Sequence, residues 1–242
     1  MSQQHSTEAP RSGRRNLYLA GLLALLIAGA GIGYFLWSGP ESDVGTAVRE
    51  GSGSPTTGSA AVMKPGPLPE KALGAENAPV TVIEYSSLTC PHCARFHTDI
   101  LPKLKQDYID KGKVKYVIRE FPLDNLAATA ALVARCVEGD RYFAFIDVLY
   151  AKQQQWAFGG GDARGRLLDI AKQAGIGEDK FNQCTADQQT LDKIIEVRRQ
   201  GSEDFGVSST PTFFVNGTML KGAQSVEEFE KLMPNEVVNK AS

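Results

Sequence analysis

The spacing of hydrophobic positions divides the 242-residue chain into distinct parts. Residues 17–37 form an apolar run without a charged side chain, whereas residues 38–78 contain few bulky apolar side chains. From Pro79 onward, apolar residues recur at the periods of strands and helices. The pattern therefore predicts a polar start at residues 1–16, an apolar segment, a linker, and a globular domain at residues 79–242.

Three stretches of the globular part predict β-strands. PVTVIEYSS, which begins at Pro79, is a short β-rich run between turn signals and indicates a buried strand. Residues 113–121 alternate apolar and charged side chains, which indicates a second strand. Asn216 and Gly217 separate two further β-rich runs and predict a hairpin.

Helical periodicity fills most of the remaining globular sequence. Apolar residues after Cys93 recur at helical spacing, and Pro102 predicts a kink or break among them. Residues 124–205 predict four or five helices, and Ser225 with Glu228 forms a possible capping box at the start of a last helix. Helices on both faces of a small mixed sheet would bury these apolar faces, so we expect an α/β fold.

The apolar run at residues 17–37 is long enough to span a bilayer as a helix. Three arginines precede it and no charge follows closely, which places residues 1–16 in the cytoplasm and the rest outside. We interpret it as an uncleaved, single-pass inner-membrane anchor with the globular domain in the periplasm, because bulky aromatic residues continue past Ala30. The alternative is a signal peptide cleaved near Ala30, which would leave a soluble periplasmic protein.

Composition restricts the remaining possibilities. Residues 38–78 are dense in Gly, Ser, Pro and Thr and predict a flexible linker. The 26 basic and 28 acidic residues give a formal net charge of -2, so the composition does not favour nucleic acid as a partner.

Cys90 and Cys93 are separated only by Pro91 and His92, at a predicted junction between strand and helix. A thiolate at a helix start faces unpaired N–H groups and the positive end of the helix dipole, so we expect a lowered pKa for Cys90. Pro91 suits the first turn because it lacks an N–H, and His92 can add a donor or a positive charge. Cys93 lies further into the helix and is expected to be less exposed.

Other uses of the four cysteines are weaker. A purely structural Cys90–Cys93 disulfide would close too short a loop to stabilise the fold much. The other two cysteines lack the spacing of a zinc site, so we expect no metal or other cofactor. Cys136 and Cys184 complete an even count, which in an oxidising compartment predicts a structural disulfide, with two buried free thiols as the alternative. His97 has no neighbours that indicate a site and is expected to be a surface or packing residue.

The CPHC motif after a strand, the helical block after the second strand, and STPTFFVNG before the hairpin together resemble the DsbA-like family of exported thiol-disulfide oxidoreductases. The resemblance covers about Pro79 to Met233. It implies a thioredoxin-like fold with an inserted all-helical subdomain at about residues 124–205, preceded by the membrane helix and the linker.

The resemblance also implies roles for single residues. Thr210 and Pro211 match the family's cis-proline loop, which lies beside the active-site cysteines and pairs with substrate backbone. Glu84 matches a buried acidic group that moves protons near Cys93. A glutamate facing the surface from the strand is the alternative for Glu84.

The function implied is that of a monomeric, membrane-tethered dithiol oxidase. Its redox-active Cys90–Cys93 disulfide would oxidise exported proteins with free thiols, and a DsbB-like membrane protein linked to quinone would reoxidise it. A stabilised Cys90 thiolate favours oxidation of the substrate, because it stabilises the reduced form of the enzyme. A reductase or isomerase of the same fold is the nearest alternative, and a metal carrier and a chaperone-type binding module are more distant ones.

Overall fold

The computed structural model describes residues 57–137, 139 and 141–239. The predicted cytoplasmic start, the predicted membrane helix at residues 17–37 and residues 38–56 of the predicted linker lie outside these described residues. Among the helices that the structure does describe, none combines the length and the apolar character needed to cross a membrane.

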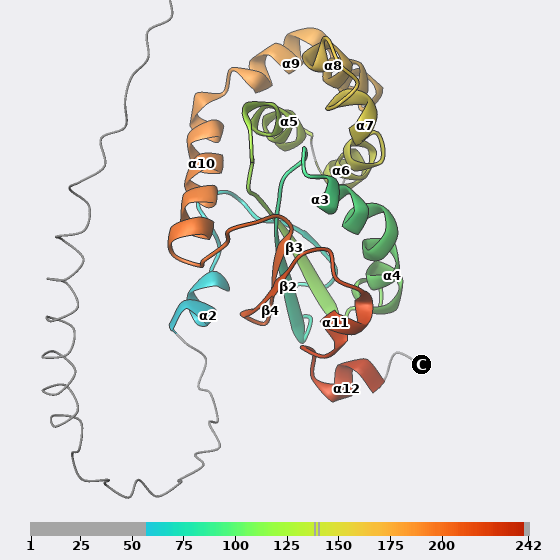
Figure 1. Cartoon of the computed structure of the whole chain (residues 1–242), viewed down its shortest axis with the longest axis vertical. Coiled ribbons are helices and arrows are strands. Elements are labelled where there is room, and N and C mark those ends of the chain that lie inside the picture. Colours follow the sequence, from blue (N-terminus) through green and yellow to red (C-terminus); the bar gives the residue numbers. More distant parts are fainter. Residues whose placement is uncertain (1–56, 138, 140, 240–242) are drawn as a thin grey trace, which may run out of the picture. The chain divides into compact units, whose positions relative to one another are not determined.

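A five-stranded mixed sheet lies at the centre of the fold (Figure 1). Its strands in chain order are β1 (Lys71–Leu73), β2 (Val80–Ser86), β3 (Val114–Glu120), β4 (Thr212–Val215) and β5 (Thr218–Lys221). Their order in space is β1-β3-β2-β4-β5, in which β2 and β3 run parallel and every other pair is antiparallel. The predicted buried strand is therefore β2, at the centre of the sheet.

Local turn chemistry determines the β4–β5 hairpin. Asn216 and Gly217 form its two-residue loop with φ angles of 46° and 88°, and Val215 pairs with Thr218 across it. A type I′ turn needs positive φ at both central positions, which Asn and Gly adopt most readily. The predicted hairpin is confirmed.

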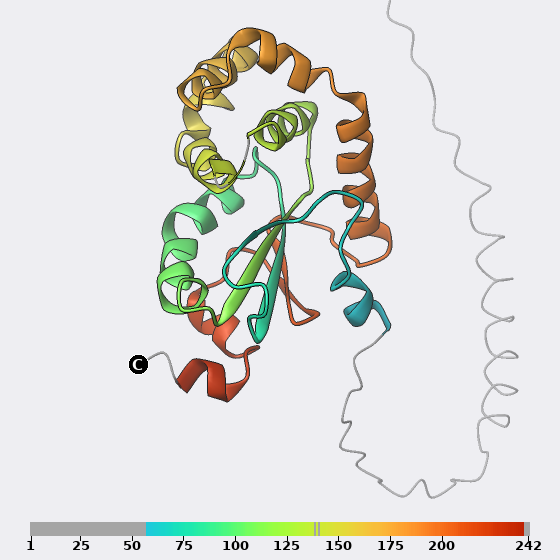
Figure 2. The ribbon, with the colours of Figure 1, turned by 180° about the vertical axis from the view of Figure 1, so that it is seen from behind.

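Helices flank the sheet on both faces. The helical segments are α2 (Thr57–Val62), α3 (Pro91–Arg95), η1 (Phe96–Ile100), α4 (Leu101–Leu104), η2 (Lys105–Ile109), α5 (Asn125–Arg135), α6 (Arg141–Ala151), α7 (Gln153–Trp156), α8 (Ala163–Gln173), α9 (Glu178–Thr185), α10 (Gln188–Glu203), α11 (Val226–Glu230) and α12 (Asn235–Val238). Figure 1 shows α2 and α10 on one side of the sheet and α3, α4 and α11 on the other, with α5 to α9 grouped at one end. Figure 2 shows the same arrangement from behind.

The first long helical segment is continuous but changes its winding. Segments α3, η1, α4 and η2 follow one another without a break, and η1 and η2 are π-helical turns. Pro102 lacks an N–H and so removes one bond of the α-helical ladder, and the N–H of Leu101 donates to the carbonyl of Phe96, five residues back. The predicted kink at Pro102 is thus a change of helical pitch.

The described residues between β3 and β4 form six helices, α5 to α10, where the sequence predicts four or five. The additional one is α7, a single turn after α6. At the other end of the chain, Ser225 precedes α11 but bonds the side chain of Glu227, so the expected capping box with Glu228 is not formed.

The prediction of a flexible linker up to residue 78 is wrong for residues 57–78. Helix α2 and strand β1 lie in this stretch, β1 pairs with β3, and the side chains of Val62 and Leu68 are buried in the core. The stretch is low in bulky residues, so composition alone indicated a linker. We call residues 57–73 the N-terminal arm.

Arg119 of β3 attaches this arm to the sheet. Arg119 is only 5% exposed, and its guanidinium donates to the carbonyls of Val62 (2.9 Å) and Lys64 (2.7 Å) and to the carboxylate of Glu70 (2.6 Å). It also donates to the hydroxyl of Tyr85 on β2. Arg119, on the charged face of β3, is therefore covered by the arm.

Replacing Arg119 by methionine should destabilise the protein strongly. The change keeps apolar volume but leaves the Glu70 carboxylate and two main-chain carbonyls without their donor. We expect a loss of about 3 kcal/mol in the free energy of unfolding, measured by urea denaturation. Arg199→Met is the matched control, because Arg199 pairs with carboxylates at the surface, and it should change stability by less than about 1 kcal/mol. Equal effects of the two changes would contradict the role given to Arg119.

A disulfide joins Cys136, at the end of α5, to Cys184 of α9, with a Cα–Cα distance of 6.1 Å. It closes a loop across 48 residues and ties together two helices of the insertion that lie far apart in sequence. The bridge therefore restricts the unfolded chain over most of the insertion.

Removing this bridge by Cys136→Ala with Cys184→Ala should lower the free energy of unfolding by about 4 kcal/mol, because the unfolded chain regains the loop entropy. Urea denaturation under oxidising conditions measures it. The control is the Cys90→Ser, Cys93→Ser variant, which keeps the bridge and should lose far less. A loss below about 1 kcal/mol in the bridge variant would contradict this expectation.

Candidate active site

Cys90 and Cys93 lie where β2 has ended and the long helical segment begins. Cys90 has extended backbone (φ -82°, ψ 119°) and precedes α3, and its carbonyl accepts the first helical hydrogen bond from Ala94 (3.1 Å). Pro91 occupies the first helical position, where its fixed φ suits the helix and its missing N–H leaves nothing unsatisfied. The Cys90 side chain consequently faces the free N–H groups of the first turn.

The surroundings of Cys90 favour its thiolate. Hydrogen bonding with the Cys93 side chain lowers the pKa of Cys90 most, while burial opposes this. Thr210 and the main-chain N–H groups of Cys93 and His92 lower the pKa further, and the result is a fall from an ordinary 9.0 to about 5. In the thiol form, the Cys90 sulfur donates to the carbonyl of Thr210 at 3.2 Å.

The pKa of Cys93 is shifted in the opposite direction, upward. Its side chain is fully buried, and burial raises its pKa well above the ordinary value, helped by the hydrogen bond with Cys90 and the charge of Glu84. Only the hydroxyl of Ser86 lowers it. The two sulfurs, three residues apart, are thus strongly unequal: Cys90 holds negative charge and Cys93 holds a proton.

A buried polar network lies behind Cys93. Ser86 donates to Glu84 Oε1 (2.7 Å), His97 Nε2 lies 3.0 Å from Glu84 Oε2, and Tyr116 donates to the same oxygen. Tyr150 bonds the Ser86 hydroxyl at 2.6 Å. Strand β2, strand β3, the π-helical turn η1 and helix α6 each contribute to this network, and all its side chains are buried.

The helical insertion holds the loop before Cys90. Gln153 at the start of α7 donates to the carbonyls of Leu88 (2.8 Å) and Cys90 (3.0 Å). Thr89 donates to Asp124 (2.7 Å), and the other oxygen of that carboxylate accepts the N–H of Ala127 and caps α5. The insertion therefore positions the reactive loop through direct hydrogen bonds.

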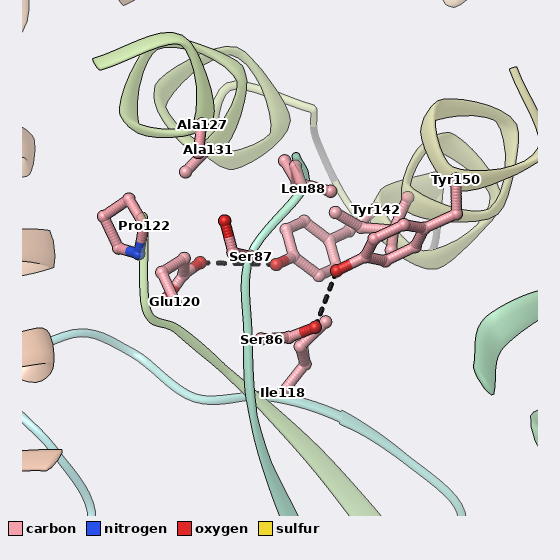
Figure 3. A pocket seen from close by; sticks show the side chains of 11 residues that line it. Ser86, Ser87, Leu88, Ile118, Glu120, Pro122, Ala127, Ala131, Tyr142 and Tyr150 are labelled. Carbon is pink, nitrogen blue, oxygen red and sulfur yellow. Dashed lines mark hydrogen bonds between the residues drawn. The ribbon is translucent and has the colours of Figure 1, made fainter. Parts of the chain in front are cut away.

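A small cavity of about 10 Å³ adjoins the network, with room for about one water molecule (Figure 3). Figure 3 shows the Ser86 hydroxyl bonded to Tyr150 and, on the far side, Tyr142 donating to Glu120. The cavity is thus polar at both ends and lies beside Ser86, whose hydroxyl contacts Cys93.

Comparison with known proteins agrees with this geometry. Residues 68–235 match the family model described as Thioredoxin. The crystal structure of Wolbachia pipientis alpha-DsbA1 is 32% identical, with a TM-score of 0.68, and the match covers 76% of this chain and 97% of that one. The chain belongs to the DsbA-like thioredoxin family.

Further relatives are more distant or longer. Disulfide bond formation protein D of Bacillus subtilis is 29% identical over 71% of this chain and 78% of its own length. A Rickettsia bellii protein named as a protein-disulfide oxidoreductase is 35% identical over 63% of this chain. The match spans only 59% of that relative's length.

The DsbA-like fold brings most of the predicted site residues together. The Thr210–Pro211 peptide bond is cis, and the loop lies against Cys90. Glu84 is completely buried, so the alternative of a surface glutamate is wrong. Pro91 and His92 are exposed, and it is the main-chain N–H of His92 that acts on Cys90. Cys90 and Cys93 are both thiols here, and the disulfide between them stays a prediction.

Two residues of the site were missed from sequence. His97 is buried and bonds Glu84, and Gln153 bonds the Cys90 carbonyl, although neither stands in a recognisable motif. His97 occurs four residues after Cys93, on the face of the helix that turns toward the sheet, and this spacing was the available signal. No metal cluster of three or more His, Cys, Asp or Glu side chains occurs among residues 57–137, 139 and 141–239.

The unequal sulfurs predict a titration in the acid range. Absorbance of the thiolate, followed against pH in the reduced protein, should give a midpoint at about 5 for Cys90. Cys93→Ala removes the main stabilising donor and should raise that midpoint by about one unit or more. Because the folded pKa lies below the unfolded value, the thiolate's contribution to stability is complete above pH 9 and is lost as the pH falls through about 5. A midpoint at pH 8 or above would contradict this.

Proposed function

We propose that this protein is a thiol-disulfide oxidoreductase that works as a dithiol oxidase on exported proteins. The observation that supports this proposal most is the difference in pKa between the two thiols: that of Cys90 is about 5, and that of Cys93 is raised. Each pKa unit by which the thiolate is stabilised favours the reduced form by about 1.4 kcal/mol, or about 30 mV. A protein that gains so much on reduction is an oxidant.

The proposed reaction begins with Cys90 and Cys93 joined by a disulfide. A substrate thiolate attacks Cys90, and the sulfur of Cys93 leaves with the electron pair and takes up a proton. A second substrate thiolate then attacks the substrate sulfur of the mixed disulfide and releases Cys90 as a thiolate. The substrate loses two electrons and two protons; the protein gains both electrons and one proton, and the other proton passes to solvent.

Substrate binding is assigned to the loop of Thr210 and Pro211. The carbonyl of Thr210 lies 3.2 Å from the Cys90 sulfur, so an extended peptide along this loop would bring its cysteine to Cys90. Thr210 and Pro211 are both buried. The protein acts as a monomer in this proposal, since one chain contributes every group of the site.

The location and the reoxidising partner rest on the sequence. Residues 17–37 would anchor the protein in the inner membrane, with residues 1–16 in the cytoplasm and the thioredoxin-like domain in the periplasm. A DsbB-like membrane protein that passes electrons to quinone would restore the disulfide. A membrane anchor would keep the two proteins in one plane and raise their encounter rate.

The test is the redox potential of the Cys90–Cys93 pair. The full chain is equilibrated in glutathione buffers and its free thiols are counted by alkylation and mass. We expect a value more positive than that of thioredoxin, about -270 mV, by about 50 mV or more, because thioredoxin's reactive thiol has a pKa of about 7.

Oxidation of a reduced, unfolded protein with known disulfides is the second measurement. The wild type should form disulfides in it stoichiometrically, and Cys90→Ser should form none. A potential at or below that of thioredoxin would favour a reductase. Equal activity of the Cys90→Ser variant would exclude thiol chemistry and leave a binding role.

A further inference from the structure

Helix α6 and the turn η1 together connect the buried network behind Cys93 to the surface. His97 is the connecting residue: its Nε2 lies 3.0 Å from Glu84, and its Nδ1 lies 3.9 Å from Asp147 Oδ1 on α6. The His97 side chain is 1% exposed, whereas that of Asp147 is 61% exposed. One imidazole thus separates a fully buried carboxylate from one in water.

We propose that His97 relays protons between Cys93 and the solvent, with Glu84 and Ser86 on its inner side and Asp147 at its outer end. The proposal rests on the proposed function, since it supplies the proton that the departing Cys93 sulfur needs. His97 does not touch the reacting sulfurs, so it is a positioning and relay residue.

The need for such a relay follows from burial. A Cys93 thiolate would form beside the Glu84 carboxylate with no exposure to water, which is strongly unfavourable for two negative charges. A proton must therefore arrive as the Cys90–Cys93 bond breaks. Tyr116 and Tyr150 have pKa values raised well above the ordinary range by burial, so they stay protonated and orient Glu84 and Ser86.

The proposed path follows hydrogen bonds from Ser86 through Glu84 to His97 and then crosses 3.9 Å to Asp147. As Cys93 leaves the disulfide, His97 Nε2 gives its proton to the Glu84 carboxylate, Glu84 passes a proton to the Ser86 oxygen, and the Ser86 proton moves to the Cys93 sulfur. Nδ1 of His97 meanwhile receives a proton from solvent at Asp147. The imidazole changes from one tautomer to the other, and reoxidation of Cys93 sends the proton outward by the same steps.

Two observations support the relay over a purely structural role. Nδ1 of His97 is buried and has no hydrogen-bond partner, although a histidine fixed only for packing would normally satisfy both ring nitrogens. Burial lowers the pKa of His97, but the nearby carboxylates of Glu84 and Asp147 outweigh it, and the net pKa is raised. The ring can therefore be doubly protonated during transfer near neutral pH.

The charged and titratable groups that face His97 come from three elements besides its own. Glu84 lies on β2, Tyr116 on β3, and Tyr150 and Asp147 on α6. The Tyr150 ring stacks on the imidazole with centroids 4.2 Å apart, which fixes its plane. Of these groups only Asp147 is exposed, so it is the entrance.

The test measures how fast dithiothreitol reduces the Cys90–Cys93 disulfide of the full chain at different pH values. Each rate is divided by the concentration of dithiothreitol thiolate, so that only the protein's own titration remains. Dithiothreitol is a small reductant, so the relay is tested even if no protein substrate is ever oxidised. A failure of the proposed function and a failure of the relay therefore give different results.

We expect the corrected wild-type rate to be level at low pH and to fall as the pH rises through the pKa of His97, above about 6.5. His97→Gln keeps a hydrogen bond to Glu84 but carries no proton, and near pH 7 it should be slower by about tenfold or more, without the inflection. Asp147→Asn should move the inflection to lower pH. Asp99→Asn, which removes a charge from the same helical turn, is the control and should match the wild type.

Several outcomes would overturn the relay. An unchanged profile in His97→Gln is one, and equal shifts in Asp147→Asn and Asp99→Asn are another, since they would indicate a general charge effect. If His97→Gln unfolds more easily, a rate lowered equally at every pH would indicate packing. Loss of the inflection in His97→Gln together with a shift to lower pH in Asp147→Asn would support the relay, because the exposed Asp147 does not contribute to the core.

Discussion

The arrangement of the site depends on one electrostatic constraint: of two adjacent sulfurs, only Cys90 can hold a negative charge. Main-chain N–H groups of the first helical turn stabilise that charge, whereas Cys93 is buried beside Glu84, where a second charge is unfavourable. This difference in pKa arises because Cys90 precedes the helix, whereas Cys93 lies three residues further on, inside it. It stabilises the reduced pair and leaves Cys90, which is 5% exposed, as the more accessible sulfur.

The rest of the fold maintains that difference. Gln153 of the insertion donates to the Cys90 carbonyl, and Tyr150 bonds the Ser86 hydroxyl. Helices remote in sequence therefore hold the reactive loop in place. The N-terminal arm covers β3 through Arg119 and keeps water from that side of the sheet.

Sequence could predict what local chemistry determines. Asn216 and Gly217 specify their own turn, and Pro91 after Cys90 specifies a helix start, so hairpin and motif were both placed correctly. It could not predict what depends on tertiary partners. The arm is held by Arg119, whose partners in the arm no local pattern reveals, and the spacing of His97 from Cys93 indicates its helical face but not its bond to Glu84. Both are recognised only when the sheet brings β2, β3 and α6 together.

The polar network behind Cys93 is hard to explain as a contribution to stability. Burying a carboxylate, an imidazole and two phenols in one core is expensive, and apolar side chains of similar volume would pack there at least as well. Two buried atoms of this region, Nδ1 of His97 and Oε1 of Gln153, even lack a partner. Unsatisfied groups of this kind concentrate at functional sites, where chemistry and not packing selects the residues. Their position, one behind Cys93 and the other beside Cys90, indicates that the core here is built for proton and thiol chemistry at the expense of packing.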